Sequence, residues 1–244
     1  MQPDLVFLIT GVFFIAVLYS SVGHAGASGY IAVMSLLSMA PSVIKPTALA
    51  LNILVASVAT VQFAGAGHFN WRLFWPFALP AVPAAFLGGY LSLPTSSFKL
   101  LLGGVLVFSA LHFLFTARSD RPVEPPPLAL ALLAGGLIGL LSGLTGTGGG
   151  IFLTPLLLVM GWALPKAAAG VSALFILVNS SAGLLGNVAS TQQLPASLWL
   201  LLPVAAGGGL LGSYMGSRRI PGQMIKRLLS AVLLIAGGKL IFAP

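Results

Sequence analysis

Gly143-Leu144-Thr145-Gly146-Thr147-Gly148-Gly149-Gly150 interrupts the apolar sequence just before a short apolar segment at residues 151–161. A similar stretch, Gly23-His24-Ala25-Gly26-Ala27-Ser28-Gly29, stands between apolar runs near the start of the chain. We call these stretches the second break and the first break. In a bilayer no water pairs with backbone N–H and C=O groups, so irregular backbone survives only where protein encloses it. The duplicated break therefore predicts an enclosed site at the membrane midplane, where secondary transporters hold their substrates.

The composition is that of a membrane protein. Hydrophobic residues make up 58% of the chain and charged residues 6%, whereas a soluble domain carries about 25% charged residues. The three acidic residues, Asp4, Asp120 and Glu124, all lie outside the apolar runs. Metal-cation transport is therefore disfavoured. Because the chain has no cysteine, thiolate metal sites are excluded, and we expect neither a metal nor a cofactor.

The formal net charge is +8, but the basic residues are scattered singly between apolar runs. This distribution indicates membrane topology and a preference for anions, not nucleic-acid binding. We therefore expect the lipid bilayer and a small anion as partners, and no nucleic acid. A homo-oligomer remains open.

A polar, proline-rich stretch at residues 118–127 divides the chain. We interpret it as a linker between a first transmembrane repeat at residues 1–117 and a second at residues 128–244. Identical residues recur in both halves at a spacing of 121 positions: Ser21 and Ser142, Gly29 and Gly150, Lys45 and Lys166. Farther along the spacing is 124 positions, in the pairs Trp75 and Trp199, Gly88 and Gly212, Tyr90 and Tyr214. This ordered series indicates an internal duplication.

Each half contains five apolar segments, of which the second is too short for a full crossing of about 20 residues. The segments of the first half are residues 5–22, 30–40, 46–65, 71–92 and 98–117. Those of the second half are residues 128–143, 151–161, 166–188, 197–216 and 223–242. We predict an all-α membrane protein with about four long helices and one half-helix in each half. Each half crosses an odd number of times, so we favour inverted repeats. With both termini outside, inversion places eight of the 11 lysines and arginines in the cytoplasm, against seven for parallel repeats.

A helix that begins at a glycine-rich break presents unpaired N–H groups and the positive end of its dipole, which suits an oxyanion. We expect the half-helices to begin at Gly29 and Gly150 and to converge on one anion. The candidate substrate-binding residues in the breaks are His24, Gly26, Ser28, Gly29, Thr145, Gly146, Thr147, Gly148, Gly149 and Gly150. The alternative is that these glycines only permit close helix packing.

Polar residues in the third apolar segments, Asn52, Asn179 and Ser180, extend the candidate set. At that depth they either line a pathway or bond a neighbouring helix. His24 fits two roles, proton-dependent anion binding or neutral hydrogen bonding. Lys45 and Lys166 either attract anions to opposite mouths of a pathway or anchor helix ends at the membrane interface.

The run from Ser142 to Gly150, the following Thr154-Pro155 and residues 167–172 resemble the sulfite exporter TauE/SafE family. The resemblance covers nearly the whole chain and is strongest in the second half. It implies a multi-pass transporter of the bacterial cytoplasmic membrane for small sulfur-containing oxyanions such as sulfite or organosulfonates, commonly an exporter. We expect the anion to be exposed alternately to each side.

Two other functional classes remain open. Gly26-Ala27-Ser28-Gly29 matches the Gly-x-Ser-Gly of rhomboid-type intramembrane proteases, in which case the histidine would have to be His112. The duplication accounts for the same residues without chemistry, so we expect no enzymatic activity. A non-transporting scaffold or assembly protein would need no ligand at the breaks.

Overall fold

The long apolar runs form helices that can cross a membrane. The computed structural model describes residues 3–91, 107, 111, 123–191 and 198–242. Within these ranges the regular structure is helical, which confirms the predicted all-α class. Six helices of the described chain are long and apolar enough to span a bilayer: Asp4–Ser21, Ser42–Gly65, Trp71–Tyr90, Leu128–Thr145, Pro165–Ala189 and Leu198–Arg219.

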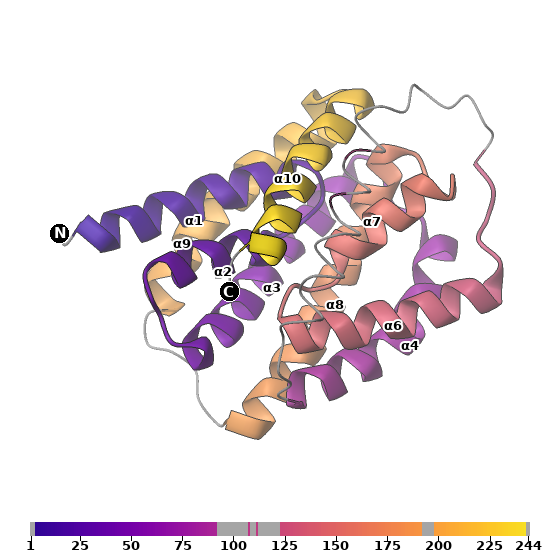
Figure 1. Ribbon diagram of the computed structural model, residues 1–244. Coiled ribbons are helices and arrows are strands. Elements are labelled where there is room, and N and C mark those ends of the chain that lie inside the picture. Colours follow the sequence, from indigo (N-terminus) through magenta and orange to yellow (C-terminus); the bar gives the residue numbers. More distant parts are fainter. Residues whose placement is uncertain (1–2, 92–106, 108–110, 112–122, 192–197, 243–244) are drawn as a thin grey trace.

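The first half forms a helical hairpin followed by two long helices (Figure 1). Its described helices are α1 (Pro3–Ser21), α2 (Ala27–Leu36), α3 (Pro41–Gly65) and α4 (Trp71–Tyr90). With 10 residues, α2 is the predicted half-helix, although it begins at Ala27 instead of Gly29. Similarly, α3 begins at Pro41 and not at residue 46, because a first helical turn does not need the N–H that proline lacks. The predicted segment at residues 98–117 and most of the linker lie outside the described residues.

The second half repeats this order of long and short helices. Its elements are α6 (Leu128–Thr145), α7 (Gly150–Val159), α8 (Pro165–Thr191), α9 (Leu198–Tyr214), the π-helical η1 (Met215–Arg219) and α10 (Gly222–Phe242). The half-helix α7 has 10 residues and begins at Gly150, as predicted. The corresponding helices α3 and α8 run antiparallel, since Gly183 lies beside Leu49 and Gly170 beside Phe63. An inverted duplication requires such opposed directions, and the duplication itself stays a prediction.

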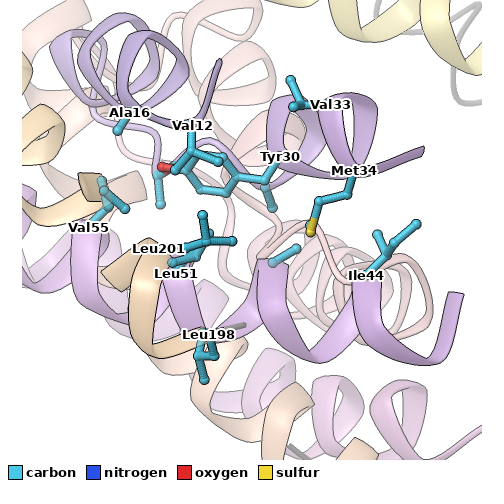
Figure 2. Packing of buried hydrophobic residues seen from close by; sticks show 14 of the residues in the cluster. Val12, Ala16, Tyr30, Val33, Met34, Ile44, Leu51, Val55, Leu198 and Leu201 are labelled. Atoms are coloured by element: carbon cyan, nitrogen blue, oxygen red, sulfur yellow. The ribbon is translucent and has the colours of Figure 1, made fainter. Parts of the chain in front are cut away.

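Eight of the described helices form two bundles, each of which contains helices from both halves, and α10 packs in a separate, smaller core. One hydrophobic core joins α1, α2 and α3 to α9, and Figure 2 shows Val12, Tyr30, Leu51 and Leu201 converging in it. A second core joins α6, α7 and α8 to α4. We call them the α1 bundle and the α6 bundle. Each bundle thus takes its fourth helix from the other half of the chain.

Glycine rows bring the exchanged helices into backbone contact. Three glycines of α6, spaced four apart, lie against carbonyl groups of α4: Gly135, Gly139 and Gly143 against Phe77, Ala81 and Ala85. Three glycines of α9 and η1 lie in the same way against α1: Gly208, Gly212 and Gly216 against Phe13, Val17 and Ser21. A side chain at any of these positions would collide with the backbone of the neighbouring helix. Among the described helices, these close backbone contacts therefore join one half of the chain to the other.

Candidate functional site

The two breaks meet between the α1 bundle and the α6 bundle. His24 of the first break is buried, and its Nε2 lies 3.0 Å from the carbonyl oxygen of Gly150 and 2.9 Å from Oγ1 of Thr154. Thr154 in turn donates its hydroxyl hydrogen to Oγ of Ser172, at 2.6 Å. A polar chain therefore leads from the first break through the first turns of α7 into α8.

Asn52 of α3 makes the second connection between the bundles. Its Oδ1 accepts a hydrogen bond from the N–H of Ala27 at 3.0 Å, at the start of α2. Its Nδ2 donates to the carbonyl oxygen of Thr147 at 3.2 Å and to Oγ of Ser180 at 3.3 Å. One fully buried amide group thus joins α2, the second break and α8.

The two half-helices differ at their N-termini. Asn52 caps the first N–H of α2, whereas Gly149, which precedes α7, provides no side-chain cap. Unpaired N–H groups at a helix start are the ones that bind an anion. The N-terminus of α2 is thus partly satisfied by a side chain and that of α7 is not, while the convergence of both half-helices on one anion stays a prediction.

Gly148 lies at the closest approach between the second break and the polar side chains of α3 and α8. A Cβ atom at this position would lie 2.6 Å from Nδ2 of Asn52 and 2.7 Å from Oγ of Ser180. Its φ of +80° falls in the left-handed region that favours glycine. Gly148, Asn52 and Ser180, each predicted from the sequence, are therefore brought together.

Several buried polar atoms in the first break and on α3, α6 and α8 have no hydrogen-bond partner within the described part of the chain. They include Nδ1 of His24, Oγ of Ser142, Oγ1 of Thr47 and Oδ1 of Asn179. A buried polar group that stays unpaired costs about 1–3 kcal/mol, so most are paired in native proteins. This set adds the hydroxyl of Ser142, next to the second break, to the predicted residues.

Other predicted residues make local contacts. Ser28 donates its hydroxyl hydrogen to the Tyr19 oxygen at 3.0 Å, and a Cβ atom at Gly29 would lie 2.5 Å from Cγ2 of Ile15. Gly26 packs against Tyr30 in the same way. These contacts fit the packing interpretation of the first break. Oγ1 of Thr145 bonds the Leu141 carbonyl oxygen and Oγ1 of Thr147, at 2.7 and 2.9 Å.

The two lysines contact helix ends at opposite ends of the molecule, and the side chain of Lys45 also lies beside Gly146 of the second break. Nζ of Lys45 donates to the carbonyl oxygen of Gly89, at the end of α4, over 3.2 Å. Nζ of Lys166 donates to the carbonyl oxygen of Ser217, in η1, also over 3.2 Å. A cation is favourable at the C-terminal end of a helix because of the helix dipole. Each lysine thereby links the α1 bundle to the α6 bundle at one end of the molecule.

Sequence reasoning missed Thr154 and Ser172 as site residues. Thr154 lies four positions after Gly150, hence on the same face of α7, and a hydroxyl on an otherwise apolar half-helix was the signal available. For a metal, the described part of the chain offers no group of three or more His, Asp or Glu residues.

Comparison with known proteins identifies the family. A family model described as "Sulfite exporter TauE/SafE" matches residues 8–240. The chain belongs to the TauE/SafE family. The TauE/SafE resemblance seen in the sequence is thus confirmed, and the chain is a multi-pass bacterial membrane transporter.

Relatives of this TauE/SafE protein carry matching names. The "Probable membrane transporter protein y4hK" of Sinorhizobium fredii is 41% identical over 248 residues, which cover 99% of this chain and 100% of that protein. The "Probable membrane transporter protein ORF9" of a Sinorhizobium species is 28% identical over 195 residues, covering 76% of this chain and 73% of that protein. A "Probable membrane transporter protein" of Xylella fastidiosa is 35% identical over 111 residues, which cover 45% of this chain and 42% of the relative. No solved structure matches the chain.

Proposed function

We propose that this TauE/SafE protein is a secondary transporter of small sulfur-containing oxyanions, which bind at the start of α7 between the two bundles. The observation that carries the proposal is the meeting of the two breaks. There His24 contacts Gly150, and Asn52 contacts Thr147. A substrate held at this junction touches both bundles, as a transport site must.

The chemistry of the junction favours an anion. The start of α7 carries the positive end of a helix dipole and has no side-chain cap. Ser142 brings a buried hydroxyl without a partner to the same region. No carboxylate lies within an apolar run to neutralise a bound cation. The restriction to sulfur-containing anions rests on the family's description as sulfite exporters.

Alternating access would be a movement of one bundle against the other, not of one sequence half against the other. The contact of Lys45 with Gly89 joins the bundles at one end, and that of Lys166 with Ser217 joins them at the opposite end. In this mechanism one lysine contact opens while the other holds. The substrate then reaches each side of the membrane in turn.

The rival interpretations have less support. For an intramembrane protease, the hydroxyl of Ser28 would need a histidine as its base, yet it is bonded to Tyr19. His112, the residue that this interpretation needs, lies outside the described residues. A scaffold protein would leave the cluster of buried polar atoms without a purpose.

The first test is the thermal stability of the purified protein in detergent against a panel of anions at matched ionic strength. The panel contains sulfite, sulfate, thiosulfate, methanesulfonate, sulfoacetate, phosphate and chloride. A ligand that binds only the native state raises the melting temperature. We expect a selective rise with one or more sulfur oxyanions and none with chloride.

Gly148→Ala tests the location of the binding site. Its Cβ atom would crowd Asn52 and Ser180, so the rise with anion should disappear. Gly161→Ala is the matched control, because Gly161 has a similar φ of +71° but no atom within 4 Å of the added Cβ. We expect this control to keep the anion effect. If no anion stabilises the wild-type protein selectively, the scaffold interpretation gains ground.

A further inference from the structure

The two nitrogens of the His24 ring have different surroundings. Nε2 lies within hydrogen-bond distance of the Gly150 carbonyl and the Thr154 hydroxyl. Nδ1 is buried and has no partner among the described residues, and the residue as a whole is 3% exposed. Nε2 therefore links the two breaks, whereas Nδ1 is available to bind a proton or a ligand.

The partners of Nε2 fix the tautomer of the ring. A carbonyl oxygen can only accept, so Nε2 carries a hydrogen and donates it to Gly150. The hydroxyl hydrogen of Thr154 is used on Ser172, so Thr154 also accepts from Nε2. In the neutral ring Nδ1 then presents a lone pair, which repels an anion. Only the protonated imidazolium donates from Nδ1 as well.

The other titratable side chains that the structure describes on α1, α2, α3, α8 and α10 are hydrogen-bonded or exposed. Lys45 on α3 and Lys166 on α8 bind helix-end carbonyls, and Arg227 on α10 is exposed. Tyr19 on α1 accepts from Ser28, and the hydroxyl of Tyr30 on α2 donates to the Ala25 carbonyl. The half-helix α7 carries no titratable residue.

A buried anion without an opposite charge is costly. Among side chains, histidine is the one whose ordinary titration falls near neutral pH. We infer that the anion binds together with one proton, which is taken up on Nδ1 of His24 and donates a hydrogen bond to the anion. This inference rests on the proposed anion site and adds its coupling ion.

Charge and protons balance when the anion binds. A solvent proton from the side that is open binds to the Nδ1 lone pair, and the ring becomes an imidazolium whose charge offsets that of the anion. When the anion leaves, Nδ1 releases the proton to the side then open. A monovalent anion would therefore cross with one proton as a neutral pair, in the same direction.

The test counts protons by calorimetric titration of the purified protein in detergent. The probe is methanesulfonate or sulfate, whichever stabilises the protein, since both stay ionised across the range in which histidine titrates, about pH 5 to 8. Titrations in two buffers of different ionisation enthalpy give the number of protons taken up. We expect about one per anion for the wild-type protein slightly above neutral pH.

His24→Gln removes the titratable nitrogen, while its amide can still donate to Gly150 and Thr154. We expect proton uptake close to zero in this variant. His68→Gln is the matched control, because His68 lies in the loop between α3 and α4, and its uptake should equal that of the wild type. Uptake by His24→Gln equal to the wild-type value would overturn the inference.

A second measurement needs no variant. For the wild-type protein the dissociation constant of the same probe should rise about tenfold per pH unit once His24 is neutral. A dissociation constant that stays flat across the histidine range would refute proton coupling and leave the anion site standing. Failure of every anion in the panel to bind would instead refute the proposed function.

Discussion

At the scale of single residues, Asn52 and Asn70 perform the same local task in different surroundings. Each accepts a hydrogen bond from a helix N-terminus, Asn52 from Ala27 at 3.0 Å and Asn70 from Leu73 at 3.2 Å. Asn52 is fully buried and donates two further hydrogen bonds, whereas Asn70 is exposed. The same side chain is therefore a surface cap in one place and a link between the bundles in the other.

We expect Asn52→Ala to cost more stability than Asn70→Ala. Asn52→Ala leaves buried hydrogen-bonding groups without a partner, and each such group costs about 1–3 kcal/mol. Asn70→Ala removes only a surface cap, worth about 1 kcal/mol. Unfolding in detergent followed by circular dichroism gives both losses. Equal losses would mean that the contacts of Asn52 do not hold the bundles together.

The depth of Asn52 in an apolar segment was enough to predict that it faces the interior. Its partner at Ala27 was not predictable, because capping patterns in a sequence are local and this cap comes from another helix. The same limit applies to His24, whose two candidate roles were both visible. Its contact with Thr154 depends on how two distant segments pack.

At the scale of elements, the starts of the half-helices show what local sequence can determine. The start of α7 at Gly150 was predicted because a run of glycines ends there. By contrast, α2 begins two residues earlier than expected, where Asn52 supplies a partner for the N–H of Ala27. The exchange of fourth helices could not be predicted from the hydrophobic pattern. In lipid, an apolar helix face does not indicate which helix it packs against.

The neighbouring glycines of α6 provide a test of the glycine rows. Gly139→Ala would push its Cβ against the Ala81 carbonyl, whereas the nearest atom to a Cβ at Gly136 is Cβ of Pro80 at 3.7 Å. We expect Gly139→Ala to lower the free energy of unfolding by about 1–3 kcal/mol. Gly136→Ala should be neutral or stabilising by up to about 1 kcal/mol, because alanine is the better helix former. Similar thermal unfolding of the two variants would contradict this role of the row.

At the scale of the whole molecule, most of the basic residues that the structure describes lie at one end. At the end where α8 begins and η1 finishes lie Arg72, Lys166, Arg218, Arg219 and Arg227. Lys45 lies at the opposite end, beside Gly89. By the positive-inside rule we expect the first of these ends to face the cytoplasm.

This orientation can be tested by labelling introduced cysteines, because the chain has no cysteine of its own that would react. Gln223 and Ala40 are exposed, Gln223 at the basic end and Ala40 before α3 at the other. We expect a membrane-impermeant maleimide to label Ala40→Cys but not Gln223→Cys in intact cells. In inverted vesicles the pattern should reverse. Labelling of Gln223→Cys from outside would reverse the predicted topology.

The exchange of fourth helices also sets the order in which the two bundles can form during synthesis. When α6 enters the membrane, its partner α4 has already been made. The first helix, α1, must wait until residues 208–216 of α9 and η1 have been inserted before its backbone contacts can form. Since a chain folds as it emerges, the α6 bundle is finished while the α1 bundle is still open. Of the described helices, α1 is thus among the last to gain its backbone contacts.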